Sequence, residues 1–379
     1  MQQIIARLEQ QLQKRALHQQ LRKLPQELAV ADFYSNDYLG LARNKKLAER
    51  IATAAGQEVQ QHGATGSRLI SGNAPLTEAV ESELAHYFQA QACLLYTSGY
   101  AANQGVLSAL LQRGDTVLYD ELSHACIKDG CRLSSANRFS FRHNDLDHLR
   151  SKLARTSGPC FVVVESVYSM DGDEAPLAAL AQLCRERGAG LIVDEAHSTG
   201  LWGLDGAGSC LAQGVAGDVL ARIHTFGKAM GVHGACVAGS ALLIRYLINF
   251  SRTFIYTTAL PPHAIVSIRE AVRFRQQQPQ LAEQLFRQVG LFRWLMQEKA
   301  PQLSRNLLPA RGPIQALLVP GSEQAVGAAR QVQAKGYGVW PILSPTVPSG
   351  QERLRICLHS FNSQPELEGL VDTLSQLHL

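Results

Sequence analysis

Seven short apolar runs dominate the middle of the chain, each long enough for one β-strand and each ending in polar residues or glycine. They lie at residues 92–100, 115–124, 138–145, 159–169, 190–200, 219–228 and 234–242, and helical stretches alternate with them. Continuous apolar strands alternating with helices are typical of a mainly parallel sheet covered on both faces. The pattern predicts an α/β fold with ligand-binding groups at the carboxyl ends of the strands.

The pattern changes outside this region. A helical stretch at residues 264–300 leads out of it, and the runs PIQALLVP, GYGVWPILSPTV and ERLRICLHS predict a small α+β domain. The first 45 or so residues are expected to return and pack against that domain. We therefore expect an N-terminal helix and arm at 1–45, a large domain at 46–280 and a small C-terminal domain at 281–379.

Composition and charge narrow the possible partners. The 379 residues are 46% hydrophobic and 18% charged, which suits a large buried core. The net charge is +4, but Lys and Arg are spread along the chain, so nucleic acid is not the expected partner. No apolar stretch reaches transmembrane length, no signal peptide is evident, and we expect a cytoplasmic protein without membrane contact.

The eight cysteines include no CxxC pair. This spacing argues against a zinc site and against a disulfide framework, so no metal is expected. We expect most of these cysteines to be small buried hydrophobic residues.

The run LIVDEAH ends in Asp194, Glu195, Ala196 and His197, and its last four letters spell a helicase box. A helicase also needs a GxxxxGK[ST] loop, and the chain has none; the nearest stretch, HTFGKAMG, has Ala229 in place of the hydroxyl residue. For such residues alone, an Asp that caps a turn and a His in the core would be the simpler interpretation. The polar groups at the other strand ends, described next, favour a cofactor-binding role for Asp194 and His197. Glu195 and Ala196 would then be spacers.

Lys228 lies after an apolar run, between Gly227 and Gly231. A desolvated ammonium is costly without a partner, and partial burial lowers the pKa of a lysine enough for it to attack a carbonyl. These properties suit a Schiff base, although an isolated lysine would more often extend to the surface.

Two further groups point to a phosphorylated, planar ligand. Ser98, Gly99 and Tyr100 follow a predicted strand and begin a predicted helix, so their amides can cradle a phosphate, although a plain turn is the simpler alternative. His124 follows another strand end and could lie over a planar ring, although a surface histidine is the commoner case.

Together these residues predict pyridoxal 5′-phosphate. Lys228 would form the Schiff base, and Asp194 would keep the pyridine nitrogen protonated, which makes the ring a better electron sink. The turn at Gly99 and Thr225 would hold the phosphate. His197 would direct a ring nitrogen at the phenolic oxygen of the cofactor.

The chain also resembles the α-oxoamine synthases in a series of motifs that runs from about residue 20 to the C-terminus. The motifs are SNDYLGL (35–41), GATGSRLISGN (63–73), TSGYAAN (97–103), DELSHA (120–125), ESVYSMDGD (165–173), VDEAHSTG (193–200), TFGKAMG (225–231), YTTALPP (256–262) and PTVPSGQERLRI (345–356). The resemblance implies the aspartate aminotransferase fold (fold type I of PLP enzymes) and a homodimer with active sites at the subunit interface.

The resemblance also implies a role for each matching residue. The catalytic residues would be Lys228, His124, stacked on the cofactor, and Asp194. Cofactor contacts would come from Gly99, Tyr100, Ser169, Asp194, His197, Thr225 and Lys228, and from Thr257 or Thr258 of the neighbouring subunit. Substrate contacts would come from Arg22, which would handle the acyl substrate, from His124 and Thr346, and from Arg355, which would pair with the amino-acid carboxylate.

The implied reaction is a decarboxylative condensation of an amino acid with an acyl thioester. The sequences of the motifs SNDYLGL and TFGKA are typical of family members that condense L-alanine with a pimeloyl thioester, which is a reaction of biotin synthesis. The leaving thiol would be coenzyme A or a carrier protein. Condensation of glycine with another acyl thioester, as in the sibling that makes 2-amino-3-oxobutyrate, is the alternative within the family. A nucleotide-binding or NTPase module is the alternative from another class.

Three features depart from the family pattern or stay open. The stretch between Leu24 and Ala31 is short, so the usual β-hairpin is missing or trimmed and the placement of Arg22 is open. Cys126 stands where family members commonly have Ser. Arg68 and Ser71 could shape the substrate channel or stabilise a turn.

Overall fold

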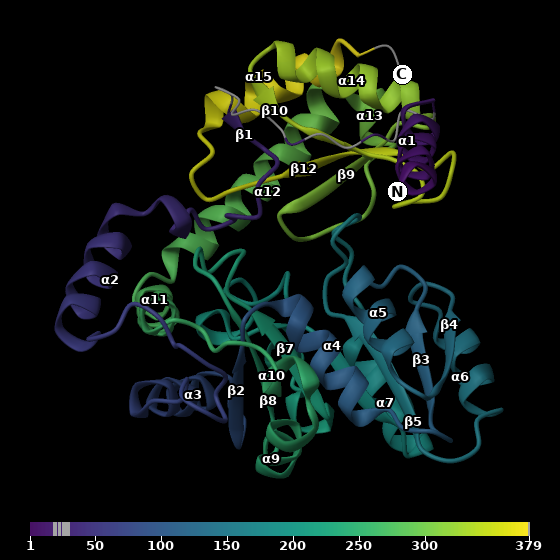
Figure 1. Cartoon of the computed structure of the whole chain (residues 1–379). Helices are drawn as coiled ribbons and strands as arrows, with labels where there is room; N and C mark the ends of the chain where they lie inside the picture. Colours follow the sequence, from purple (N-terminus) through teal and green to yellow (C-terminus); the bar gives the residue numbers. More distant parts are fainter. Residues whose placement is uncertain (18–20, 22–23, 25–30, 378–379) are drawn as a thin grey trace. The chain divides into compact units, whose positions relative to one another are not determined.

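The computed structural model describes residues 1–17, 21, 24 and 31–377 (Figure 1). They form two compact units. The large unit comprises residues 37–169 and 173–284, and the small unit comprises residues 1–36, 170–172 and 285–379, within the described ranges. None of the described helices is long and apolar enough to cross a membrane.

The large unit is built on a seven-stranded sheet, as the apolar runs predicted. The strands stand in the order β2 (Ala92–Tyr96), β8 (Ala235–Gly239), β7 (Ala221–Thr225), β6 (Gly190–Asp194), β5 (Cys160–Glu165), β3 (Thr116–Asp120) and β4 (Asn137–Phe141). The pairs from β7 to β4 are parallel, whereas β8 is antiparallel to both of its neighbours. The expected mainly parallel α/β fold is confirmed.

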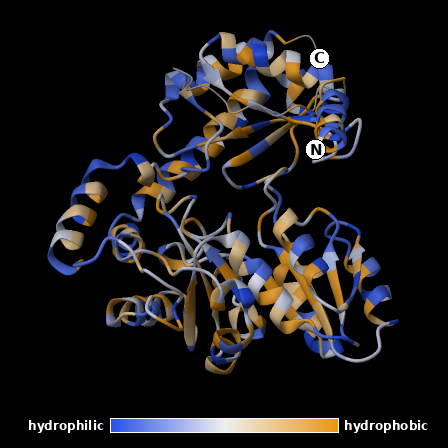
Figure 2. Cartoon of the chain, in the orientation of Figure 1, coloured by the Kyte–Doolittle hydropathy of each residue, from blue (hydrophilic) through white to orange (hydrophobic). Residues whose placement is uncertain are grey.

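Helices cover both faces of this sheet, which explains why its strands are apolar at nearly every position. Val163, Ile192 and Ile223 point into one core with α4 (Gly99–Leu110), α5 (Ala125–Leu133) and α9 (Ala241–Phe250). Val162 and Val193 point into the other core with α6 (Leu146–Leu153) and α7 (Leu177–Arg187). Each such side chain contributes about 1.5–3 kcal/mol by leaving water, and Figure 2 shows the apolar colouring of these strands.

The large unit also contains other helices. They are α2 (Lys45–Glu58), α3 (Pro75–Tyr87) and α11 (Pro262–Gln276), with short elements η1 (Leu41–Arg43), η2 (Leu204–Gly206), α8 (Ser209–Ala212), η3 (Ala216–Asp218) and α10 (Arg252–Ile255). Asn44 caps α2 by accepting the Leu47 amide. Arg269 of α11 binds both carboxylate oxygens of Glu58, at 2.6 and 2.7 Å, and so fastens α11 to α2.

The small unit contains an antiparallel sheet in the order β11 (Trp340–Ile342), β12 (Arg353–Cys357) and β9 (Ile314–Leu318). Its helices are α1 (Gln2–Leu17), α13 (Pro301–Ser304), α14 (Ser322–Ala334), α15 (Gln364–Ser375) and the greater part of α12 (Gln280–Lys299). A parallel pair joins β1 (Ala31–Asp32) to β10 (Tyr337–Gly338). This pairing joins the end of the N-terminal segment to the small unit.

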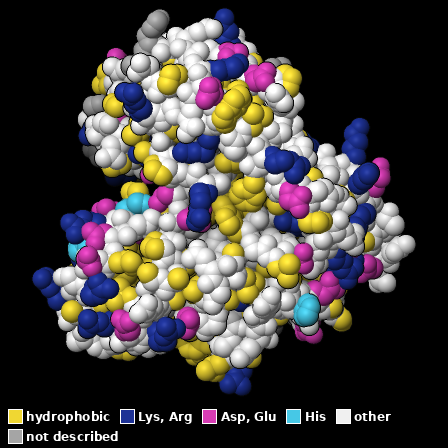
Figure 3. Space-filling model, turned by 180° about the vertical axis from the view of Figure 1, so that it is seen from behind, with side chains coloured by type: hydrophobic (Ala, Val, Ile, Leu, Met, Phe, Trp, Pro, Cys, Tyr) yellow, Lys and Arg dark blue, Asp and Glu magenta, His cyan; other side chains and the backbone are white. Residues whose placement is uncertain are grey.

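Charged side chains are mixed over the surface. On the face shown in Figure 3, Lys and Arg are interspersed with Asp and Glu. All eight cysteines are buried free thiols, in agreement with the expectation of small buried residues.

Candidate active site

The sheet gathers the predicted site residues at the carboxyl ends of its parallel strands. Glu165 and Asp194 are register partners at the ends of β5 and β6. Thr225 ends β7 and pairs with Ala235 of β8, which in turn pairs with Tyr96 at the end of β2. The antiparallel β8 therefore brings the turn after β2 beside the end of β7.

Asp194 is buried and both of its carboxylate oxygens are held. The Ala196 amide donates to Oδ1 at 2.8 Å, and the side-chain amide of Asn103 donates to Oδ2 at 2.7 Å. Asn103 also donates to the Gly99 carbonyl at 3.0 Å. A carboxylate fixed in this way can present its remaining lone pairs to a cationic ring N–H, as the sequence predicts for Asp194.

Glu165 lies beside Asp194 and is also buried. Burial raises the pKa of Glu165 to about 8, and the nearby charge of Asp194 adds to the rise. The His124 amide donates to Oε1 of Glu165 at 2.6 Å. At neutral pH Glu165 is therefore a neutral carboxyl that anchors the backbone of the predicted stacking histidine.

Lys228 contacts His197. The Lys228 Nζ lies 2.7 Å from Nε2 of His197, and Nδ1 of the same ring lies 2.8 Å from the phenol oxygen of Tyr38. The loop that carries Lys228 closes at Gly231, where φ is 68° and a Cβ atom would collide with the backbone of Leu41 and Ala42. The predicted Lys228 and His197 are thus brought together, with Tyr38 as an additional member.

The turn after β2 carries the residues that are predicted to cradle a phosphate. Ser98 caps α4 by accepting the Ala101 amide, and the amides of Gly99 and Tyr100 open the helix, where intrahelical acceptors are lacking. A Cβ atom at Gly99 would lie 3.5 Å from Cβ of Thr225. The side chain at this position would fill the space between the helix N-terminus and the Thr225 hydroxyl, so glycine leaves room there for an anion.

His124 is the N-cap of α5, and its Nδ1 lies 3.2 Å from the Cys126 amide nitrogen and 2.9 Å from the Cys126 Sγ. Its side chain is exposed, and the ring stands edge-on to Tyr100 at 6.4 Å. Partial desolvation lowers the pKa of His124; Lys228 also lowers it, while Asp194 opposes the shift. His124 thus lies within electrostatic reach of the predicted cofactor residues and favours the neutral form.

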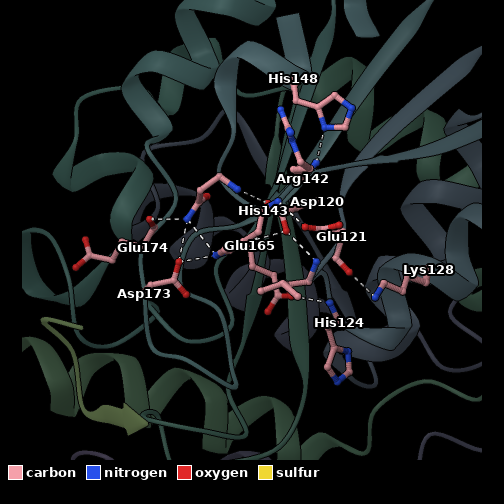
Figure 4. A network of polar contacts seen from close by, with 12 residues as sticks. Asp120, Glu121, His124, Lys128, Arg142, His143, His148, Glu165, Asp173 and Glu174 are labelled. Atoms are coloured by element: carbon pink, nitrogen blue, oxygen red, sulfur yellow. Dashed lines mark hydrogen bonds and ion pairs between the residues drawn. The ribbon is translucent and has the colours of Figure 1, made fainter. Parts of the chain in front are cut away.

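A second histidine, His143, connects the ends of β3 and β4 to the loop after β5 (Figure 4). His143 follows β4, and its ring nitrogens lie 2.9 Å from Asp120 at the end of β3 and 2.7 Å from Asp173 in the loop after β5. The His143 amide donates to Glu121, and Asn144 donates to Asp173. This network was not predicted from the sequence, although the run HND (143–145) follows an apolar run as the other site residues do.

Glu195 is not a spacer, contrary to the expectation. It is fully buried, and it accepts the amides of Ser209 at 2.7 Å and Cys210 at 2.9 Å, together with the Ser198 hydroxyl. The opposing Gly208 has φ 111° and would place a Cβ atom 2.9 Å from this carboxylate. Glu195 therefore fixes the glycine-rich loop that follows DEAH.

Arg68 has a structural set of contacts. It binds both oxygens of Glu81, at 2.8 and 2.9 Å, and donates to Asn73. Ser71 lies 3.3 Å from the Thr65 hydroxyl in the same turn. These bonds favour the turn-stabilising interpretation of Arg68 and Ser71. Arg68 also lines a pocket of the large unit together with Thr257 and Thr258.

Of the predicted substrate residues, His124 lies in the large unit, Arg355 and Thr346 belong to the small unit, and Arg22 lies outside the described residues. Arg355 is nearly buried and donates to the side-chain oxygen of Asn36 at 2.9 Å, while Thr346 is exposed. Arg22 and the shortened stretch after Leu24 fall outside the described residues. Ser169 ends the first segment of the large unit and is half-buried. Their assembly around Lys228 stays a prediction.

Comparison with protein families shows the family to which the chain belongs. The family model for aminotransferase class I and II matches residues 29–374. The chain belongs to this family.

Relatives and solved structures narrow the family further. The chain is 42% identical to 8-amino-7-oxononanoate synthase from Alkalilimnicola ehrlichii, over 92% of this chain and 88% of the relative, and 40% identical to that from Methylococcus capsulatus, over 91% and 88%. The serine palmitoyltransferase of S. paucimobilis with a bound PLP–myriocin aldimine superposes with a TM-score of 0.85 at 26% identity, covering 91% of this chain and 86% of that one. The crystal structure of 8-amino-7-oxononanoate synthase from Francisella tularensis superposes with a TM-score of 0.78 at 27% identity, covering 92% and 97%.

These similarities confirm the predicted resemblance to α-oxoamine synthases, and with it a PLP-dependent acyltransferase. They also confirm, at the level of the family, the predicted pyridoxal 5′-phosphate cofactor. The helicase and NTPase interpretations of DEAH are excluded, since the same residues belong to a different fold family.

Proposed function

We propose that this protein condenses L-alanine with a pimeloyl thioester, releasing CO2 and the free thiol carrier and forming 8-amino-7-oxononanoate for biotin synthesis. The names of relatives at 40–42% identity support the reaction. The observation on which the proposal depends is the contact of Lys228 with His197, beside a buried Asp194 whose carboxylate is held on both oxygens. We expect the reaction to take place in the cytoplasm.

The residues of the large unit fit pyridoxal 5′-phosphate. Asp194 would hold the pyridine N–H, and His197 and Ser169 would contact the phenolic oxygen side of the ring. The amides of Gly99 and Tyr100 and the Thr225 hydroxyl would hold the phosphate. When bound, the cofactor supplies an electron sink for negative charge at the α-carbon of the amino acid.

Lys228 would move the α-proton. Once its amine is free, Nζ can accept the proton from the α-carbon of alanine and later return one to the product. His197 lies at hydrogen-bond distance from Nζ and from Tyr38, so it can orient the amine and share its charge. This contact is the reason that we place the base at Lys228 and not at His124.

Binding of the two substrates would involve the small unit. Arg355 would pair with the alanine carboxylate, because a guanidinium fixes a carboxylate in plane through two parallel hydrogen bonds. Arg22 would contact the acyl donor, Thr346 would contact the bound substrate, and His124 would cover the face of the cofactor ring. A homodimer would complete the phosphate site with Thr257 or Thr258 of the neighbouring subunit.

Replacement of Lys228 tests the proposal directly. The purified protein should be yellow, with visible absorbance that borohydride removes, and Lys228→Ala should lose both this absorbance and turnover of L-alanine with pimeloyl-CoA. Lys299→Ala is the matched control, since Lys299 pairs with Asp372 on the surface of the small unit. Turnover that survives in Lys228→Ala would contradict the assignment.

A substrate comparison separates the two reactions that the family allows. L-alanine and glycine should be assayed with pimeloyl-CoA, a pimeloyl carrier protein and acetyl-CoA. The proposal predicts the highest kcat/KM for L-alanine with a pimeloyl donor. A preference for glycine with acetyl-CoA would instead favour the sibling activity that makes 2-amino-3-oxobutyrate.

A further inference from the structure

One residue, Cys126, contacts the imidazole of His124 at its Nδ1 nitrogen. Nδ1 of His124 lies 3.2 Å from the amide nitrogen and 2.9 Å from the Sγ of Cys126. Cys126 is buried in the first turn of α5, and the backbone of His124 is separately fixed by its bond to Glu165. The ring and the backbone of this histidine therefore have different anchors.

The direction of these hydrogen bonds can be assigned from the chemistry of the donors. A backbone amide can only donate, so Nδ1 must be the acceptor and carries no proton. The thiol faces the same unprotonated nitrogen, so it also donates. Burial raises the pKa of the Cys126 thiol well above its ordinary value, with the charge of Asp194 adding to the rise, so the thiol keeps its proton.

We propose that Cys126 is a positioning residue for the active-site histidine: its thiol and its amide donate together to Nδ1 of His124 and keep the imidazole proton on Nε2. The tautomer of a neutral histidine is set by the hydrogen bond at its other nitrogen. His124 therefore presents an N–H donor, and not a lone pair, on the side of the ring away from α5.

The surroundings of His124 agree with a neutral ring. The charged or titratable groups that face it are Asp194 on β6, Lys228 after β7, Glu165 on β5, Tyr100 on α4, and Cys126, Lys128 and Asp129 on α5 itself. Partial desolvation has the largest effect on the pKa of His124 and disfavours the charged imidazolium. The first turn of α5 acts in the same direction, because a helix N-terminus disfavours a cation.

This tautomer matters for the reaction, and that consequence rests on the proposed function. An Nε2–H donor can bind a substrate carboxylate or the developing oxyanion of the acyl donor, whereas an Nε2 lone pair would repel both. Loss of one neutral hydrogen bond to Nδ1 changes the equilibrium between the two His124 tautomers by about fivefold. We therefore expect Cys126→Ala to lower kcat/KM about fivefold and to raise the apparent pKa of His124 by about half a unit to one unit.

The test measures the tautomer without relying on turnover. Long-range proton–nitrogen correlation spectra of the 15N-labelled holoenzyme distinguish Nδ1–H from Nε2–H, and a His124→Gln variant assigns the signal. Cys126→Ala removes the thiol donor, and Cys126→Ser replaces it with a hydroxyl donor. Cys131→Ala is the matched control, because Cys131 is a buried thiol further along the same helix.

The expected result is an Nε2–H ring in the wild type, a detectable share of Nδ1–H or an upward shifted titration in Cys126→Ala, and recovery in Cys126→Ser. Cys131→Ala should match the wild type. An Nδ1–H ring in the wild type would overturn the proposal even if Cys126→Ala failed to fold. An unchanged His124 signal in a folded Cys126→Ala would also overturn it. Because these spectra need no substrate, failure of the proposed reaction would not affect them.

Discussion

At the scale of single residues, the chemistry was predictable and its supporting contacts were not. Asp194, His197 and Lys228 stand at strand ends, so their position and type indicated a cofactor site. Tyr38 lies 159 positions before His197, and nothing in the spacing connects them. Asn103 did carry a signal, because it follows Gly99 by one helical turn and so faces the same end of α4.

Asn103 is the residue that aligns the carboxylate of Asp194. Its amide donates to Oδ2 at 2.7 Å in a fully buried setting, and a hydrogen bond to a charged group contributes about 1.5–3 kcal/mol. We expect Asn103→Ala to weaken cofactor binding about tenfold, measured by titrating the apoenzyme with pyridoxal 5′-phosphate. Asn249→Ala, which removes an exposed bond of the same spacing to the Arg245 carbonyl, should bind normally. Equal affinity of the two variants would show that Asn103 does not orient Asp194.

At the scale of elements, the apolar runs located all seven strands of the large sheet and predicted a mainly parallel sheet, but they did not show that β8 is antiparallel. β7 and β8 are separated only by residues 226–234, which is too short for the crossover that a parallel pair requires. This spacing could have shown that β8 is antiparallel. The antiparallel direction of β8 matters for the candidate site, because it brings the Gly99 turn beside Thr225.

The loop after β6 depends on Glu195. Its buried carboxylate satisfies two amides and one hydroxyl, and leaving such donors unpaired costs about 1–3 kcal/mol each before relaxation. We expect Glu195→Ala to lower the free energy of unfolding by about 3 kcal/mol, and Glu195→Gln by less, as measured by urea denaturation. Glu186→Ala on the exposed face of α7 is the control. A loss below about 0.5 kcal/mol for Glu195→Ala would contradict this role.

The ends of β3, β4 and β5 are joined through His143. Burial alone lowers the pKa of His143, but hydrogen bonds to Asp120 and Asp173 outweigh burial and raise the pKa to about 10. The imidazolium therefore contributes stability that is fully present below pH 6.5, the ordinary range of histidine, and is lost as the pH rises through 10.

The raised pKa of His143 gives a prediction for the stability of the His143→Gln variant. The variant should be less stable than the wild type by about 2 kcal/mol near pH 6, because Asp120 is left buried without its cation. The difference should shrink steadily between pH 6.5 and pH 10. Urea denaturation of both proteins across this range measures it, and Asp173→Asn should weaken the same pH dependence. A difference that stays constant with pH would mean that His143 is not charged.

At the scale of the whole molecule, the sequence predicts a small C-terminal domain at 281–379 but does not show how the complete site assembles. The return of the chain to β10 through β1 depends on two residues, which is too short a run to be predicted from a pattern. The proposed substrate contacts of Arg355 and Thr346 and the proposed phosphate contacts of Thr257 and Thr258 all bring distant parts of the chain to Lys228. Such contacts depend on tertiary and quaternary arrangement and not on local sequence.

A mixed dimer tests whether the two subunits share their sites. Lys228→Ala and the double variant Thr257→Val/Thr258→Val should each be nearly inactive at limiting cofactor. If the threonines act across the interface, a mixed dimer has one site with Lys228 from one chain and both threonines from the other. Random mixing should then restore about a quarter of wild-type turnover, since about half of the dimers are mixed and each has one intact site. If the threonines act within their own chain, every site in the mixed dimer carries a defect, and refolding the two variants together would give no more activity than the sum of the separate proteins.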